Sequence, residues 1–223
     1  MDIENILRQL VISAIPILIA ITFHEASHGF VAFRLGDPTA KLMGRLTLNP
    51  IAHIDKVGTI LMPIMLLLLT NGQFVFGYAK PVPINPANFK DPKKHMAYSA
   101  AAGPITNISL AIISALLIKL FLPLLDYILP GSMANAVVTP LSLMLLSSIK
   151  WNVLLAVFNL IPVPPLDGGR VMVGLLPHKQ AISYSRIEPY GMIIVIFLIM
   201  TGIAQKFIYP VMMLLFSLIT LIL

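Results

Sequence analysis

The feature that most restricts what this chain can fold into is a series of long apolar stretches. A helix that crosses a lipid bilayer needs about 20 mostly apolar residues. Three stretches, Ile6–Phe33, Ala97–Leu122 and Met133–Ile161, exceed that length. Val57–Thr70 is shorter, and the apolar block Ile187–Leu223 is interrupted by a Thr-Gly pair, which predicts two short helices. The pattern therefore predicts an integral membrane protein built from helices.

The composition excludes other classes of protein. Hydrophobic residues make up 58% of the 223 residues and charged residues 11%, against roughly 45–50% and about 25% in soluble domains. A soluble globule could not bury so much apolar surface, and a disordered chain would be more polar. The chain has no cysteine, which excludes disulfides, iron–sulfur clusters and thiolate metal sites. The net charge of +6 indicates basic loops at one membrane face, so we expect a lipid bilayer and no nucleic acid as partner.

The expected fold class is an all-α polytopic membrane protein with about five spanning helices. One further segment, Val57–Thr70, is expected to be re-entrant or half-buried. The chain is expected to form a single membrane domain over residues 1–223, with a core at 6–180 and a C-terminal helical pair at 187–223. The sequence leaves the oligomeric state open.

Three ionisable residues lie inside the first apolar stretch, in the sequence His24-Glu25-Ala26-Ser27-His28. Helix positions four residues apart lie on one face, so these two imidazoles can bind one zinc ion. Glu25, beside the first histidine, is placed to act as a general base on water. Ionisable groups inside a membrane segment are costly and usually functional. A polar cluster that only caps the helix end is the alternative, and the pattern favours a catalytic zinc site.

A catalytic zinc ion takes three protein ligands, so a third residue must come from elsewhere in the chain. Asp167 is the strongest candidate, because the prolines and glycines around it end the fourth long helix and force irregular backbone. Such backbone is tolerated at membrane depth only where it is buried in protein or lines a cavity. A helix stop with an aspartate turn is the simpler alternative. The other candidates for the third ligand are His53, Asp55, His95, Asp126, His178 and Glu188.

Five motifs, in the expected order over about residues 15 to 180, resemble the site-2 protease family of intramembrane zinc metalloproteases. The likeness is greatest to the short prokaryotic branch, which lacks PDZ and CBS domains. The motifs are His24–His28, Asn49–Asp55, Gly77–Pro83, Ala102–Asn107 and Asn159–Arg170.

The resemblance implies that His24, His28 and Asp167 bind Zn²⁺ and that Glu25 is catalytic. It also implies that Asn159, eight residues before the aspartate, helps to hold the substrate or to stabilise an oxyanion. The implied function is a zinc-dependent endopeptidase that cleaves transmembrane segments of membrane proteins, in a prokaryotic cell membrane. Its implied partner is a transmembrane protein or peptide substrate.

Other polar residues have two interpretations each. His53 and Asp55 could support or gate the active site, or could cap the loop before the second apolar segment, and the two interpretations are evenly balanced. Asn107 is expected to cap or cross-link its helix. Asn152 could form hydrogen bonds between helices.

The number of membrane crossings gives an independent test of the zinc site. His24 lies near the far end of the first helix, and Asp167 follows the fourth long segment, so both must reach the same membrane face. This requires that one intervening segment does not cross, and Val57–Thr70 is the shortest. In that arrangement one face holds 11 of the 15 lysines and arginines, which the positive-inside rule places in the cytoplasm. The 11 are Arg34, Lys41, Arg45, Lys56, Lys80, Lys90, Lys93, Lys94, Arg170, Lys179 and Arg186.

The stretch Gln73–Ile84 is expected to be extended near the active site, because Lys80-Pro81-Val82-Pro83 cannot be helical throughout. Phe74–Phe76 and Pro81–Ile84 could form the two arms of a short β-hairpin. An extended edge of this kind could pair with an unwound substrate strand.

A membrane transporter or channel that moves protons or metal ions through intramembrane histidines and carboxylates is the alternative function. The position of Glu25 discriminates between the two. A zinc hydrolase needs a base beside the first of two histidines at this spacing, whereas a metal transporter does not. The sequence therefore favours the protease.

Overall fold

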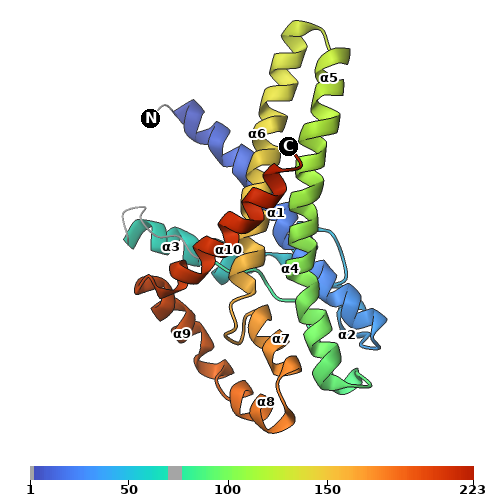
Figure 1. Ribbon diagram of the computed structural model, residues 1–223, viewed down its shortest axis with the longest axis vertical. Helices are drawn as coiled ribbons and strands as arrows, with labels where there is room; N and C mark the ends of the chain where they lie inside the picture. The colour runs from blue at the N-terminus through green and yellow to red at the C-terminus, as the bar shows by residue number, and fades with distance from the viewer. Residues whose placement is uncertain (1–2, 70–76) are drawn as a thin grey trace.

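The computed structural model describes residues 3–69 and 77–223, and the regular elements in these ranges are all helical (Figure 1). Short 3-10 turns at Pro50–His53 and Pro86–Asn88 and π-helical turns at Lys56–Leu61 and Leu117–Phe121 join the main elements. The helices are α1 (Ile3–Arg34), α2 (Thr39–Leu42), α3 (Met62–Leu69), α4 (Pro92–Leu116), α5 (Leu122–Ile128), α6 (Gly131–Asn159), α7 (Asp167–Leu175), α8 (His178–Ser185), α9 (Glu188–Met200) and α10 (Ile203–Thr220).

Four helical segments of the described chain are long and apolar enough to cross a membrane. The pair α8 and α9, bent by 69°, makes a fifth if the two act as one span. Large apolar side chains cover the outside of these helices, as expected for a surface that faces lipid. The predicted polytopic helical fold is confirmed. The four segments are Val11–Arg34, Pro92–Ile128, Gly131–Asn159 and Ile203–Thr220.

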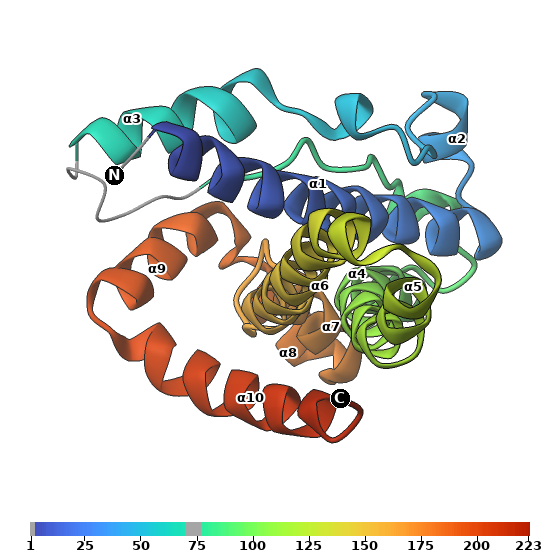
Figure 2. The same cartoon turned by 90° about the horizontal axis from the view of Figure 1, so that it is seen from above.

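Helix α4 is the centre of the molecule and packs against α1, α6 and α7. Figure 2 shows α4 and α6 end-on, with α1 crossing beside them at a steep angle. Small residues let these helices approach closely, as is usual in membranes. For example, a Cβ on Gly174 of α7 would lie 2.2 Å from the Cβ of Ala97 of α4. Farther along, an apolar cluster joins α4, α6 and α10 through Ala111, Ala115, Ile149, Val153, Val157 and Ile219.

Helices α9 and α10 form an arc on the other side of α6 from α1 (Figure 2). The break predicted between them is confirmed, because Gly202 has a φ of +74° that turns the chain between the two helices. Residues with a side chain rarely adopt this left-handed conformation, whereas glycine does so easily, so the helix can end there.

The segment that contains α3 starts and returns on one side of the molecule. The amide of Lys80 donates to the carbonyl oxygen of His53 over 2.9 Å, so the chain after α3 lies beside the chain before it. The amide of Asn85 also donates to Asp37, just beyond the end of α1, over 2.7 Å. These contacts hold the two ends of the described segment together, as expected for a re-entrant or half-buried segment.

Asp37 fastens the end of α1 to the chain that leads into α4. Its carboxylate is fully buried and accepts hydrogen bonds from Thr39, from the amide of Asn85 and from the side chain of Asn88. Burial by itself raises the pKa of the Asp37 carboxyl, but these hydrogen bonds outweigh it and hold the pKa below its usual range. The charged carboxylate therefore stabilises this junction.

The predicted β-hairpin is wrong. Its first arm, Phe74–Phe76, lies outside the described residues, and its second arm is extended but is not part of a sheet. The physical reason lies in the hydrogen-bond donors of the segment. Pro81 and Pro83 have none, and the amides of Tyr78, Lys80 and Val82 donate to Gly58, His53 and Glu25.

A candidate metal centre

Helix α1 places His24 and His28 one turn apart, as their spacing predicts. Both side chains are buried, each with 7% of the residue exposed. Their Nε2 atoms lie 3.1 Å apart. The two rings are nearly perpendicular, at 88°, so both nitrogens can point at one position between them.

Asp167 reaches the histidines because the chain after α6 folds back on itself. The Oδ2 atom of Asp167 lies 3.1 Å from Nε2 of His24 and 3.4 Å from Nε2 of His28. Two glycines make this fold possible at the start of α7. A Cβ on Gly168 would lie 2.2 Å from the carbonyl oxygen of Leu160, and one on Gly169 would meet backbone equally closely.

One face of α4 forms the wall behind the two histidines. Ser99, Gly103 and Asn107 follow each other at intervals of four residues and therefore share this face. Gly103 is in the middle, where a Cβ would lie 2.5 Å from both imidazole rings. The carbonyl of Ser99 contacts His28, and the side chain of Asn107 contacts His24, on either side of it.

These contacts leave three acceptor atoms facing one another. Nδ1 of His28 lies 2.7 Å from the carbonyl oxygen of Ser99, which can only accept, so Nδ1 carries a proton and the neutral ring has its lone pair on Nε2. Nδ1 of His24 lies 2.6 Å from Oδ1 of Asn107 in the same way. Oδ2 of Asp167 is buried and has no hydrogen-bond donor among the described residues. Such a group of acceptors repels itself unless it holds a cation.

The distances fit zinc in particular. Tetrahedral coordination with bonds of roughly 2.0–2.1 Å places neighbouring ligand atoms about 3.3 Å apart. The three separations between His24, His28 and Asp167 are 3.1, 3.1 and 3.4 Å. Nitrogen and carboxylate oxygen are also the donors that catalytic zinc uses. In the described chain this is the one group of three His, Asp or Glu residues found able to hold a metal ion.

Glu25 lies beside the three-residue centre, but its carboxylate is held by a different segment of the chain. Its Oε2 accepts a hydrogen bond of 2.9 Å from the backbone amide of Val82, in the extended segment after α3. Arg45 also holds that segment, because its Nη2 donates to the carbonyl of Lys80 over 2.8 Å. The guanidinium also lies 3.4 Å from the carbonyl oxygen of Pro81.

His53 and Asp55 form loop contacts instead of contacts with the metal centre. Asp55 accepts hydrogen bonds from the amides of Val57 and Gly58 and thereby caps the turn that begins at Lys56. Nε2 of His53 lies 2.9 Å from the carbonyl oxygen of Thr47. The hydrogen bonds of both residues therefore favour the loop interpretation.

The remaining candidates also lie apart from the three-residue centre. His95 packs on Phe89 and Tyr98, and Glu188 lies 3.6 Å from Arg170. Asn159 donates from Nδ2 to the carbonyl of Leu155 in its own helix, over 2.9 Å, and no described hydrogen bond joins it to the centre. Asp126 in α5 and His178 at the start of α8 are likewise outside the group.

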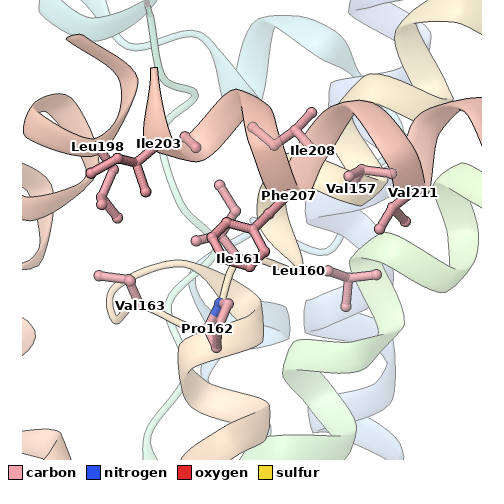
Figure 3. Close-up of a pocket in the computed structure, with 11 residues that line it drawn as sticks. Val157, Leu160, Ile161, Pro162, Val163, Leu198, Ile203, Phe207, Ile208 and Val211 are labelled. Atoms are coloured by element: carbon pink, nitrogen blue, oxygen red, sulfur yellow. The ribbon is translucent and has the colours of Figure 1, made fainter. Parts of the chain in front are cut away.

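An apolar cavity of about 320 Å³ lies between the end of α6 and α10, next to the loop that leads to Asp167 (Figure 3). Its lining includes Leu160, Pro162 and Val163 from the chain after α6, and Phe207 and Val211 from α10. No residue that lines it can ionise, so it cannot supply acid–base chemistry.

Sequence reasoning missed three parts of this arrangement: the contact of Asn107 with His24, the closeness of Gly103 and the amide of Val82. A signal for the first two was present, since a serine, a glycine and an asparagine at intervals of four in an apolar helix mark a face that packs on something polar. No signal pointed to the amide of Val82.

Fold and site together define an integral membrane protein with a buried His-His-Asp cluster that could hold a metal ion and a glutamate beside it. The family model described as "Peptidase family M50" matches residues 124–202, which include Asp167 but not the two histidines. A Bacillus subtilis (strain 168) protein, "Putative zinc metalloprotease YwhC", is 37% identical over 198 residues, covering 89% of this chain and 84% of that protein.

Two mycobacterial proteins named "Putative zinc metalloprotease Rip2" are also similar, each at 25% identity. The alignment with the Mycolicibacterium smegmatis protein covers 86% of this chain and 68% of the relative, and that with the Mycobacterium tuberculosis protein covers 84% and 64%. No solved structure matches significantly. The chain belongs to peptidase family M50, the site-2 protease family, as the motifs predicted. Nothing in these relatives favours the transporter alternative.

Proposed function

We propose that His24, His28 and Asp167 hold the zinc ion of this intramembrane zinc metalloprotease and that Glu25 is its general base. The observation that carries the proposal is the set of three separations of 3.1–3.4 Å between buried acceptor atoms. They match the edges of a zinc tetrahedron, which leaves the fourth position for chemistry.

A bound zinc ion supplies Lewis acidity for a hydrolysis in which water is the nucleophile. Glu25 takes a proton from the attacking water on a carboxylate oxygen as the new carbon–oxygen bond forms. It then returns that proton to the peptide nitrogen as the carbon–nitrogen bond breaks. The hydrogen bond from Val82 holds one carboxylate oxygen, Oε2, so that the other is free for this transfer.

The substrate in this proposal is a transmembrane segment of another protein, unwound at the bond to be cut. Its backbone lies beside the extended segment that carries Val82. The amides of Tyr78, Lys80 and Val82 already have partners, and so do the carbonyl oxygens of Tyr78, Lys80 and Pro81. A paired substrate would therefore use the remaining backbone groups of this segment or replace one of these partners. Asn159 stands near the start of the loop to Asp167 and is proposed to contact the substrate.

The whole chain is proposed to act as one domain in a prokaryotic cell membrane, with the active site towards the cytoplasm. The basic loops around α2, the start of α4 and α8 all lie at one end of the molecule, opposite the turn between α5 and α6 (Figure 1). Single cysteines test this without background because the chain has none. Those at the exposed Lys41, Lys90 and Lys179 should label only from the cytoplasm and one at Ser132 only from outside. The reverse labelling would place the site on the outer face.

Glu25→Gln tests the function. The purified variant should bind zinc as wild type does, since all three ligands remain, and cleave a model transmembrane peptide roughly 100- to 10,000-fold more slowly. Glu188→Gln is the matched control, because the Glu188 side chain is half exposed and forms its salt bridge with Arg170, away from the three-residue centre. Cleavage by Glu25→Gln at a rate near that of wild type would refute the assignment.

A further inference from the structure

A chain of buried amide and hydroxyl groups leads away from His24 into the interface between α4 and α6. Asn107 and Asn152 are both fully buried, on facing positions of the two helices. Oδ1 of Asn107 lies 2.6 Å from Nδ1 of His24, and Nδ2 of Asn107 donates to Oδ1 of Asn152 over 2.8 Å. Asn152 in turn donates to the carbonyl oxygen of Ser148 over 2.9 Å.

The direction of these hydrogen bonds is determined by acceptors that cannot donate. Nδ2 of Asn152 faces the backbone carbonyl of Ser148, so its Oδ1 must face Asn107. Nδ2 of Asn107 donates both to that oxygen and to the backbone carbonyl of Ala20, over 3.2 Å. The Oδ1 atom of Asn107 is therefore the one that faces His24, and His24 must carry its proton on Nδ1.

The two histidines thus have different kinds of support. His28 is oriented by the backbone carbonyl of Ser99, which no substitution of the Ser99 side chain removes. His24 is oriented by a side chain, and that side chain is itself oriented from α6. Helix α6 also leads into the loop that delivers Asp167, so the support of His24 is tied to the helix that positions the third ligand.

We propose that Asn107 is a positioning residue that fixes the ring orientation and tautomer of His24 for zinc binding, and that Asn152 acts through Asn107. The inference rests on the proposed role of His24 as a zinc ligand. Partners of this kind behind a metal ligand typically change metal affinity 10- to 100-fold. Asn107 contacts Nδ1 of His24, whereas Nε2 is the nitrogen that faces the proposed metal position.

The test is the rate of zinc release to a chromogenic chelator from the purified full chain in detergent, together with the visible absorption of the cobalt-substituted protein. Asn107→Leu keeps the volume but removes the acceptor, and should release zinc roughly 10- to 100-fold faster. It should also shift the cobalt bands, which a loss of packing alone would not do. Asn152→Leu should change both readouts in the same direction by a smaller factor, since Asn107 keeps its bond to Ala20.

The double variant separates positioning from general destabilisation. If Asn152 acts only through Asn107, Asn107→Leu with Asn152→Leu should release zinc no faster than Asn107→Leu alone. Ser109→Ala is the matched control: Ser109 lies on the same helix as Asn107, but it is exposed and its hydroxyl donates to the carbonyl oxygen of Ile105 in its own helix over 2.9 Å. It should leave zinc release and the cobalt spectrum unchanged.

His24→Ala makes the two possible failures distinguishable. If His24→Ala loses zinc while Asn107→Leu and Asn152→Leu release it at the wild-type rate, the positioning role is wrong and the zinc site stands. If His24→Ala retains zinc as wild type does, the proposed site is wrong and the inference falls with it. Additive effects of Asn107→Leu and Asn152→Leu would also overturn the inference.

Discussion

The two faces of α1 at the active site are supported in different ways. The face with His24 and His28 lies against α4, where a glycine and a backbone carbonyl leave the rings almost no freedom. The face with Glu25 lies against an irregular segment, and a single backbone amide from Val82 holds its carboxylate. The proposed metal ligands are thus held by helix packing, whereas the proposed base is held by a loop.

This difference follows from what each group must do. Zinc ligands must keep fixed distances, and packed helices hold positions well because cores resist small displacements. A general base has to receive and return a proton beside a substrate that enters and leaves, and loops commonly carry such contacts. We therefore expect damage on the α4 side to remove zinc and damage on the loop side to lower turnover while zinc remains bound.

The largest effect is expected from Asp167→Ala. Two histidines alone hold zinc weakly, so the purified variant should contain little zinc and should not cleave peptide. Asp55→Ala is the control: it removes a carboxylate that caps a loop turn and should keep its zinc at a stability cost of about 1 kcal/mol. Metal analysis after gel filtration measures both. Zinc loss by Asp55→Ala with zinc retained by Asp167→Ala would move the third ligand to the loop.

The next largest effect is expected from Gly103→Ala, which adds one methyl group between the two imidazoles. A Cβ there would lie 2.5 Å from both rings, so at least one ring must move and zinc affinity should fall about 100-fold. Gly131→Ala is the matched control, because a Cβ at that helical glycine would meet no atom within 4 Å apart from its own chain neighbours and helix backbone. A competition titration with a chelator gives the affinities. Equal affinities for the two variants would show that the α4 face does not constrain the ligands.

The sequence predicted those parts of the molecule that depend on local spacing. His24 and His28 follow from positions four apart in one helix, and the break at Gly202 follows from a single glycine. Asp167 was found because prolines and glycines in a membrane segment are conspicuous. The chain before α3 and the chain after it lie side by side, as expected from the number of crossings that the proposed zinc site requires.

The parts that could not be predicted depend on which backbone groups meet after folding. The hairpin failed because the amides of Lys80 and Val82 found acceptors in His53 and Glu25, residues far away in the sequence. The contact of Asn107 with His24 depends on how two helices pack, and its residue type alone suggested only a cap or cross-link. Hydrogen bonds between distant elements leave no periodic pattern to detect.

Val82→Pro tests the loop side of the comparison, because it removes the one hydrogen bond from the segment to Glu25. The backbone there already lies between Pro81 and Pro83, and hydrogen bonds to charged groups contribute about 1.5–3 kcal/mol. Turnover should fall roughly 10- to 100-fold with normal zinc content. Val82→Ala keeps the amide and should cleave at close to the wild-type rate. Loss of zinc in Val82→Pro would mean that the two sides are not separate.

The smallest effect is expected one step farther from the base, at Arg45. Its guanidinium donates to the carbonyl oxygens of Lys80 and Pro81 and so holds the segment that carries the amide of Val82. Arg45→Gln should weaken that hold by about 1 kcal/mol and lower turnover roughly fivefold, because Glu25 is then less often in place. Lys41→Gln removes the same charge from the same loop region but leaves the segment untouched, so it separates positioning from a general effect of charge. Zinc content should be normal in both variants. Equal turnover in the two would show that the extended segment holds Glu25 without help from Arg45. Val82 would then be the last residue of the loop on which the position of Glu25 depends.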